Sequence, residues 1–233
     1  MKKITTLYVT GILLLSITSC TKDFEEINTN PNAVDKATPN FIFSRSQLDG
    51  LNNNYFFTSI IECGQMMQHY STYKEASGAG DKYLDNEVYY SAFFARIYPN
   101  SINEVTIVIN ALKGDPNNSN RLNIARIWRA YLFHRITDLY GDIPYSEAAK
   151  ANSDLLFLPK YDSQEFIYKD LLKELDEAAL ALDASKPSFG GADLIYNGDI
   201  NKWKKFSYSL MLRLGMRLSK VDPALSKNWV NKA

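Results

Sequence analysis

Apolar residues recur at three- and four-residue intervals from Phe41 almost to the end of the chain, and this spacing constrains the fold more than any other feature. The clearest stretch carries Ile124, Ile127, Trp128, Tyr131 and Leu132 at positions i, i+3, i+4, i+7 and i+8. Such spacing places the apolar side chains on one face of an α-helix. No stretch of the sequence is convincingly strand-rich, so we predict an all-α fold.

The helical pattern is interrupted at several points. The expected helices cover residues 41–50 and 54–73, a pair from near Tyr89 to 113, a long helix that ends near Tyr140, and helices after Tyr161 and after Asp199. Gly50 and the asparagines that follow it should separate the first two helices, and the small polar residues 74–88 should form a loop. The sequence Gly114-Asp115-Pro116 is a strong stop signal.

Two helices have recognisable ends. In the helix expected after Tyr161, Asp162 is a candidate N-cap, and Glu165 lies at the capping-box spacing from it. Tyr161 and Phe166 lie at the hydrophobic-staple positions of this helix. Its buried face should consist of Ile167, Leu171, Leu175, Ala178 and Leu182. The second should begin after Asp199, carry Trp203, Phe206, Leu210, Leu214 and Leu218 on its apolar face, and stop at Pro223, with residues 228–233 trailing.

Helices that follow one another in pairs favour a tetratricopeptide-like α-superhelix. The strict repeat period of roughly 34 residues and its consensus positions are absent, so the pairs must be divergent. Nothing near the C-terminus resembles a capping helix. We therefore expect residues 39–233 to form a helical domain that is the N-terminal portion of a longer protein.

The N-terminus reads as an export signal. Lys2 and Lys3 precede an apolar run from Leu7 to Ile17, which is too short to remain as a membrane anchor. The run ends in Ile17-Thr18-Ser19-Cys20, which resembles a bacterial lipobox. The sequence thus predicts a lipoprotein signal peptide over residues 1–19 and lipidation of Cys20, the alternative being a secretory signal with a chance cysteine.

Residues 20–38 follow as a polar segment. Asp23, Glu25 and Glu26 resemble the acidic signal that sends some lipoproteins to the cell surface, and asparagine, threonine and proline dominate the remainder. We interpret this stretch as an extended, lipidated tether.

Composition excludes several function classes. The 26 basic and 26 acidic side chains balance, so the chain lacks the basic character of a nucleic-acid-binding protein. Two cysteines and two histidines are too few for a disulfide scaffold or a Cys/His zinc site. We expect no metal, no cofactor and no nucleic-acid partner.

Three motifs in order resemble the SusD/RagB-like family of nutrient-binding lipoproteins. They are the run from Ile136 through Tyr140-Gly141-Asp142-Ile143-Pro144 to Ala148, the run Pro159-Lys160-Tyr161-Asp162 to Glu165, and Gly198-Asp199 to Trp203 followed by the arginine- and leucine-rich stretch that ends at Val221-Asp222-Pro223. The lipobox and Asn28-Thr29-Asn30-Pro31-Asn32 agree with the resemblance. Each motif also has a structural explanation: Gly141 can end a helix, and Trp203 and Arg213 should pin helices together.

The resemblance implies a surface-exposed lipoprotein of the outer membrane that is not an enzyme. Such proteins bind an oligosaccharide or peptide and deliver it to a TonB-dependent, SusC-like transporter barrel. They are typically about twice as long as this chain. The competing class is a helical surface scaffold that binds only protein partners.

Candidate ligand residues lie in the aromatic-rich segment 70–98. Aromatic faces stack on the C–H surfaces of sugars, and carboxylates and amides accept hydrogen bonds from hydroxyls. Aromatics in a loop are the least expected to be buried, so the candidates are Tyr73, Tyr83, Asp81, Asp85 and Asn86. Two alternatives are that Tyr89, Phe93 and Phe94 face the core, and that exposed aromatics meet the barrel partner.

A hydrolase is the third hypothesis. His134 and Asp138 lie four residues apart on one helix, and Asp138, Asp142 and Glu147 could supply a carboxylate pair. No nucleophile elbow accompanies them. A helix-surface hydrogen bond and turn or cap roles explain these residues more simply.

Overall fold

The computed structural model describes residues 38–52, 56–73, 80–84 and 86–233, which belong to one compact unit. The expected signal peptide, Cys20 and tether lie outside the described residues, apart from Thr38, and so does Asp85. None of the helices in these ranges has the length and apolar character that a bilayer crossing requires.

The fold is helical almost throughout. In order, its elements are α3 (Pro39–Asn52), the π-helix η1 (Phe56–Gln65), the 3₁₀ turn η3 (Gly80–Lys82), α4 (Glu87–Ile97), the π-helix η4 (Tyr98–Ile102), α5 (Asn103–Leu112), the 3₁₀ turn η5 (Pro116–Asn118), α6 (Ser119–Tyr140), β1 (Ile143–Pro144), α7 (Ala151–Asp154), β2 (Tyr161–Asp162), α8 (Gln164–Ala181), the 3₁₀ turn η6 (Gly190–Ala192), α9 (Ile200–Arg217), the 3₁₀ turn η7 (Leu218–Lys220) and α10 (Pro223–Lys232). The expected all-α architecture is confirmed.

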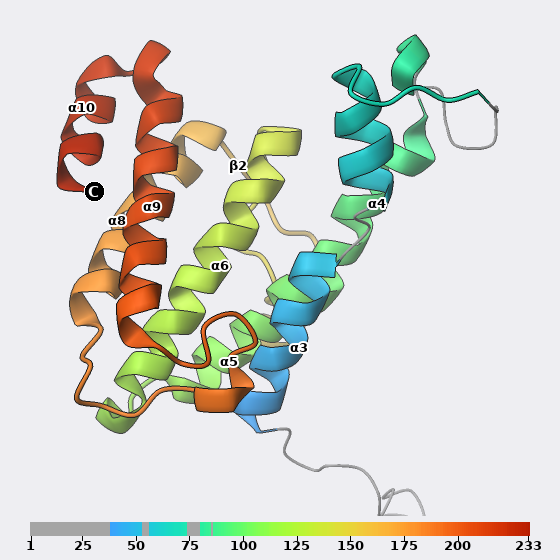
Figure 1. The fold of residues 1–233 in the computed structure, drawn as a ribbon. Coiled ribbons are helices and arrows are strands. Elements are labelled where there is room, and N and C mark those ends of the chain that lie inside the picture. The colour runs from blue at the N-terminus through green and yellow to red at the C-terminus, as the bar shows by residue number, and fades with distance from the viewer. Residues whose placement is uncertain (1–37, 53–55, 74–79, 85) are drawn as a thin grey trace, which may run out of the picture. The chain divides into compact units, whose positions relative to one another are not determined.

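Helix α6 is the central element. It packs against α5 on one side and against α8 and α9 on the other, and α10 extends the stack from α9 (Figure 1). The predicted stripe of α6 is buried except for Tyr131, which is half-buried. Trp128 on this stripe is fully enclosed, and its Nε1 donates a hydrogen bond to Ser46 Oγ of α3 at 3.0 Å. Burial of these large side chains is the main stabilising term of the stack.

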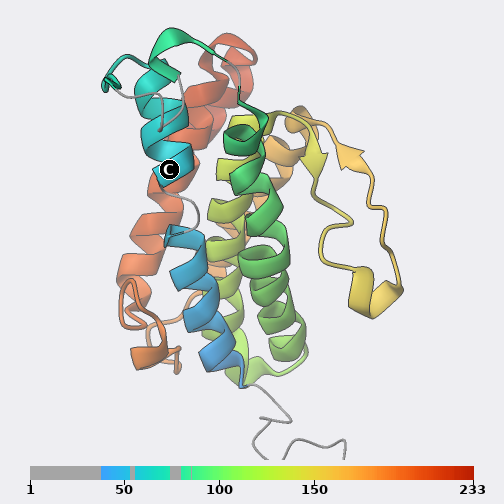
Figure 2. The same cartoon turned by 90° about the vertical axis from the view of Figure 1, so that its right-hand side faces the viewer.

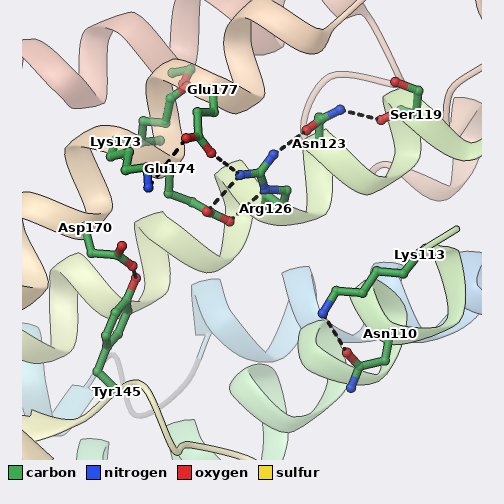
Figure 3. Close-up of polar contacts among 12 residues, drawn as sticks. Asn110, Lys113, Ser119, Asn123, Arg126, Tyr145, Asp170, Lys173, Glu174 and Glu177 are labelled. Carbon is green, nitrogen blue, oxygen red and sulfur yellow. Dashed lines mark hydrogen bonds and ion pairs between the residues drawn. The ribbon is translucent and has the colours of Figure 1, made fainter. Parts of the chain in front are cut away.

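The contact between α6 and α8 also has a polar edge. Figure 3 shows the Arg126 guanidinium of α6 between two carboxylates of α8, with Nε 2.8 Å from Glu174 Oε1 and Nη2 3.0 Å from Glu177 Oε2. Burial opposes ionisation of Glu174, but the hydrogen bond and charge of Arg126 outweigh it and hold the pKa of Glu174 below its usual value. Arg126 therefore links α6 to α8 through two ion pairs.

A buried carboxylate ties α3 to α9. Asp193 Oδ1 accepts a hydrogen bond from Gln47 Nε2 of α3 at 2.8 Å, and Oδ2 accepts one from Trp203 Nε1 of α9 at 2.6 Å. Asp193 Oδ2 also accepts a hydrogen bond from the backbone amide of Gly198 at 2.9 Å. The structural role predicted for Trp203 is confirmed, whereas Arg213 is exposed and makes no hydrogen bond or ion pair to another helix among the described residues.

Gly50 does not separate two helices as the sequence suggested. It lies inside α3, where a Cβ atom would stand 2.7 Å from side-chain atoms of both Trp128 and Leu132. The glycine is explained by the close approach of α3 to α6, not by a break. The helix expected over 54–73 is also wrong in extent: η1 ends at Gln65, residues 67–68 form a turn, and residues 69–73 have no regular secondary structure.

Three helix ends differ from prediction. Ser163 caps α8 by accepting from the Phe166 amide, because Asp162 belongs to β2 and accepts from the Ser146 amide instead. Pro223 does not terminate the chain's helices but occupies the first turn of α10, where its missing N–H costs nothing. Residues 228–232 are consequently helical and do not trail. The buried face predicted for α8 is confirmed.

Between α6 and α8 the chain leaves the helix stack for a short segment that contains β1, α7 and β2. Strands β1 and β2 pair antiparallel, Ile143 with Asp162 and Pro144 with Tyr161, and close its base. Residues 149–160, which we call the arm, project away from the helices (Figure 2). The arm exposes Leu155, Phe157 and Leu158, the last of these at 90%.

Candidate functional site

The structure places the predicted ligand residues between η1 and α4. Tyr73 is 93% exposed and Tyr83 is 66% exposed, the latter with a positive φ of 56°. Both side chains are therefore largely exposed to solvent, which is compatible with a stacking role. Asp85 lies outside the described residues.

Asp81 and Asn86 have structural duties as well. The Asp81 carboxylate accepts hydrogen bonds from the Thr72 amide at 2.9 Å and from Thr72 Oγ1 at 3.0 Å, and these bonds hold the pKa of Asp81 below its usual value. Asn86 is the N-cap of α4 and accepts from the Val88 amide. The two side chains thus shape the segment that carries Tyr73 and Tyr83.

A groove lies next to this segment, between α4, the end of α6 and β2. Its volume is about 500 Å³, within the range of small-ligand sites. We call it the tyrosine groove; it is lined by Glu87, Tyr90, Ser91, Phe94, Tyr140, Asp142 and Tyr161. A second hollow shares Tyr90 and Tyr140 with it and continues to Met66 and Met67, just before the predicted segment.

Tyr140 holds the two sides of the groove together. Its hydroxyl donates to the Tyr90 carbonyl at 2.7 Å and accepts from the Phe94 amide at 3.3 Å. The Phe94 and Tyr140 rings meet edge to face with centroids 5.3 Å apart. Since α6 ends at Tyr140 and the next residue, Gly141, has a φ of 74°, the chain turns away immediately and leaves the Tyr140 ring at the groove wall.

Both walls carry a carboxylate. Glu87 is exposed in the first turn of α4, and Asp142 follows the turn at the end of α6. Asp142 Oδ1 accepts from the Gln164 amide at 2.8 Å, which leaves Oδ2 for a further donor. The groove thus combines aromatic faces with hydrogen-bond acceptors, the two chemistries that a neutral sugar ring requires.

Sequence reasoning missed part of this groove. Tyr90 and Phe94 belong to the aromatic segment, but Tyr140 and Tyr161 come from motifs that we assigned to the scaffold. The chain separates these residues by up to 71 positions, so only the folded structure brings them together. The signal that could have found them is the pair of tyrosines beside turn residues in two adjacent motifs.

The catalytic candidates are held in structural contacts. His134 Nε2 lies 3.0 Å from Asp138 Oδ2, and Tyr168 donates to the other oxygen of this carboxylate. Arg217 Nε donates to Tyr168 Oη at 2.9 Å and lies 3.3 Å from Asp138 Oδ2. Burial opposes ionisation of Asp138, but these donors and charges outweigh it and lower the pKa of its carboxyl.

Asp142 and Glu147 have the turn and cap roles expected of them. Glu147 Oε2 accepts from the Lys160 amide at 2.9 Å, so it fixes the far side of the arm, as Asp142 fixes the start of α8. Across the part of the chain that the structure describes, no three His, Cys, Asp or Glu side chains gather into a metal site.

The described residues thus form stacked helix pairs that carry a groove lined by aromatic rings and hydrogen-bond acceptors. The chain belongs to the SusD-like family, whose model, described as starch-binding and associating with the outer membrane, matches residues 31–233. The resemblance inferred from the three motifs is thereby confirmed.

Solved structures agree with this assignment. A chitin-binding protein shares 37% sequence identity with this chain and superposes with a TM-score of 0.76. The match covers 83% of this chain and 42% of the chitin-binding protein. A SusD homolog from Parabacteroides distasonis is 26% identical with a TM-score of 0.73, covering 84% and 38%. A chitin-binding SusD homolog from Flavobacterium johnsoniae is 25% identical with a TM-score of 0.70, covering 83% and 42%. The chain thus spans about two-fifths of the length of these proteins, and no curated protein matches it.

Proposed function

We propose that this protein binds an oligosaccharide in the tyrosine groove as the capture component of a nutrient-uptake system. The observation that carries the proposal is the groove itself: Tyr90, Tyr140 and Tyr161 converge from three elements, with Glu87 and Asp142 at the rim. Membership of a starch-binding family and the likeness to chitin-binding proteins support a glycan over the peptide that the sequence left open.

The chemistry follows from the lining. Sugar C–H faces stack on tyrosine rings, and the sugar hydroxyls donate to carboxylate oxygens. Tyr161 is well suited to this role because it is exposed and belongs to a strand whose pairing with Pro144 fixes its backbone. The protein binds its ligand without altering it, so the proposed role is not enzymatic.

The segment before α4 extends the same surface. We place Tyr73 and Tyr83 as additional stacking faces for a longer oligosaccharide, with Asp81, Asp85 and Asn86 as acceptors or as the residues that shape the segment. This arrangement suits a ligand of several units, because the tyrosine groove alone holds only part of such a chain.

The proposed setting is the outer face of the outer membrane. Cys20 carries the lipid, residues 20–38 form the tether, and the helical domain passes its ligand to a TonB-dependent, SusC-like transporter. The family's association with the outer membrane supports this setting. The composition of residues 1–20 supports the anchor.

Calorimetric titration with chitin and starch oligosaccharides tests the groove. We expect Tyr161→Ala to weaken binding about 5- to 10-fold, the loss that corresponds to roughly 1 kcal/mol of stacking. Phe41→Ala, which removes an equally exposed ring from α3, is the matched control and should bind as the unmodified protein does. Equal losses in both variants, or flat traces for the unmodified chain, would reject the proposal.

The scaffold hypothesis has one observation in its favour, the apolar arm. Leu155, Phe157 and Leu158 are exposed together on a projecting segment, as at protein–protein contacts. If protein binding is the sole function, serine at these three positions should abolish partner capture while glycan titrations stay flat. Glycan binding that survives these substitutions favours the tyrosine groove.

A further inference from the structure

Helices α6 and α9 pack side by side (Figure 1). A further groove lies between them. Its volume is about 280 Å³. We call it the arginine groove; its polar and aromatic lining comprises Tyr131, His134, Arg135, Phe206, Ser209 and Arg213. None of these residues lines the tyrosine groove, so the two sites are separate.

Two aromatic rings are held in position in this groove. Tyr131 stacks on Trp128 with centroids 5.2 Å apart, and Phe206 meets Trp203 edge to face at 5.5 Å. Both tryptophans are fully buried, so their neighbours have rigid supports. Tyr131 and Phe206 themselves are half-buried and contact each other at 5.8 Å. The groove therefore offers preorganised aromatic faces.

The charged side chains that line the groove, Arg135 and Arg213, are both cationic. Arg135 is fixed by donating from Nη1 to the Gly50 carbonyl at 2.7 Å and by lying 4.8 Å from the Phe93 ring centroid. Arg213 is exposed on α9. Within the described ranges neither guanidinium pairs with an aspartate or glutamate, and the lining contains no acidic or amide side chain.

His134 supplies an independent observation. It lines the arginine groove yet is only 3% exposed, and its Nδ1 makes no hydrogen bond within the described part of the chain. A buried polar atom without a partner is costly unless something satisfies it. The Nδ1 atom of His134 thus lacks a hydrogen-bond partner, while the Asp138 carboxylate, which is not part of the groove lining, lies 3.0 Å from its Nε2.

The balance of donors and acceptors indicates the ligand. Guanidinium groups only donate, whereas the carboxylates of the tyrosine groove only accept. The hydroxyls of a neutral sugar both donate and accept, so such a sugar could bind in either groove, but here it would leave the charges of Arg135 and Arg213 uncompensated. The arginine groove requires a ligand that brings a planar anionic acceptor and also a C–H face for the rings.

We propose that the arginine groove binds the carboxylate of an acidic sugar, a hexuronic acid unit of an oligosaccharide. This inference rests on the proposed function, since it assigns a substrate class to a glycan-binding protein, but it concerns a different site. Arg213 contacts the carboxylate, Arg135 contributes positive charge, and Phe206 stacks on the sugar ring.

Titration of the full chain with an oligogalacturonate and with a neutral chitin oligosaccharide of equal length tests the inference. We expect Arg213→Gln to weaken oligogalacturonate binding at least 10-fold and to leave the neutral ligand unaffected. The matched control is Lys205→Gln, which removes an exposed cation of α9 outside the groove and should preserve both affinities.

The outcomes separate the two sites. Absence of oligogalacturonate binding, or equal losses in Arg213→Gln and Lys205→Gln, would overturn the inference, while neutral-sugar binding sensitive to Tyr161→Ala would still uphold the proposed function. Retained oligogalacturonate binding with no neutral-sugar binding would reject the tyrosine groove and support the arginine groove. Arg213 is exposed, so thermal melting should confirm that its variant remains folded.

Discussion

Two carboxylates, the buried Asp193 and the half-buried Glu104, show what single residues contribute. Asp193 receives four hydrogen-bond donors, among them Gln47, Trp203 and the Gly198 amide, so its charge is well compensated. Glu104 at the start of α5 is different. Arg45 Nε is 3.9 Å from its Oε1, and its buried Oε2 has no hydrogen-bond partner within the described residues.

Asp193→Ala should lower the free energy of unfolding by about 3 kcal/mol, because it leaves the side-chain donors of Gln47 and Trp203 buried and unpaired. Urea denaturation measures the loss. Asp154→Ala, which removes an exposed carboxylate of α7, is the control and should change stability by no more than about 0.5 kcal/mol. Equal effects of the two substitutions would contradict the role given to Asp193.

Glu104 should make stability depend on pH. Burial and the nearby Asp49 charge raise its pKa to about 7, although Arg45 opposes the shift. Because the folded state holds this proton more tightly than the unfolded chain, the stabilisation is complete below about pH 4.5 and is lost as the pH rises to 7.

The measurement is a comparison of unfolding free energies with those of Glu104→Gln between pH 4.5 and 7.5. Because Glu104 is only half-buried and partly screened by solvent, the unmodified protein should lose about 1 to 2 kcal/mol relative to the variant across this interval. Parallel pH profiles for the two proteins would show that the Glu104 carboxyl is not perturbed.

At the scale of elements, close approach between helices decides features that local propensity cannot. Gly50 has the sequence character of a break, yet α3 continues through it because Trp128 and Leu132 of α6 occupy the space a side chain would need. Similarly, the capping-box motif favoured Asp162 as the N-cap of α8. Because β2 pairs with β1, Asp162 instead accepts a hydrogen bond from the Ser146 amide, and Ser163 is the N-cap.

Gly50→Val should therefore destabilise the protein by about 2 kcal/mol or more, since added methyl groups overpack the contact between α3 and α6. Thermal or urea unfolding checks this value. Leu51→Val, at an exposed neighbouring position of α3, should cost little. A neutral or stabilising Gly50→Val would instead agree with a break at this glycine.

For the whole molecule, the proposed function depends on where the helical domain is held. Dual or triple acylation at Cys20 would make membrane attachment effectively permanent, because each buried methylene contributes about 0.8 kcal/mol. The tether would then let the two grooves face solutes outside the cell.

Cys20→Ser should move the protein from the membrane fraction of its native host to the soluble fraction. Cys63→Ser, which changes the exposed cysteine of η1, is the matched control and should stay with the membrane. Fractionation with immunoblotting, together with mass spectrometry of the N-terminal peptide, makes the measurement. A membrane-bound Cys20→Ser protein would show that the lipid is not the anchor.

The sequence by itself determined the class of fold and the family. Periodic apolar positions specify helices and their buried faces, as on α6 and α8, because the helical repeat is a local property of the chain. Three ordered motifs specified the family. The predicted tyrosines 73 and 83 are exposed as expected, although their role in binding stays a prediction.

Tertiary structure alone decided the two grooves and several helix ends. Tyr90, Tyr140 and Tyr161 form one surface, and Arg135 and Arg213 another, only because distant helices pack side by side. Which helix approaches which is set by non-local burial and steric fit, and neither leaves a periodic trace in the sequence. For the same reason Gly50 could be understood only once α6 lay against it.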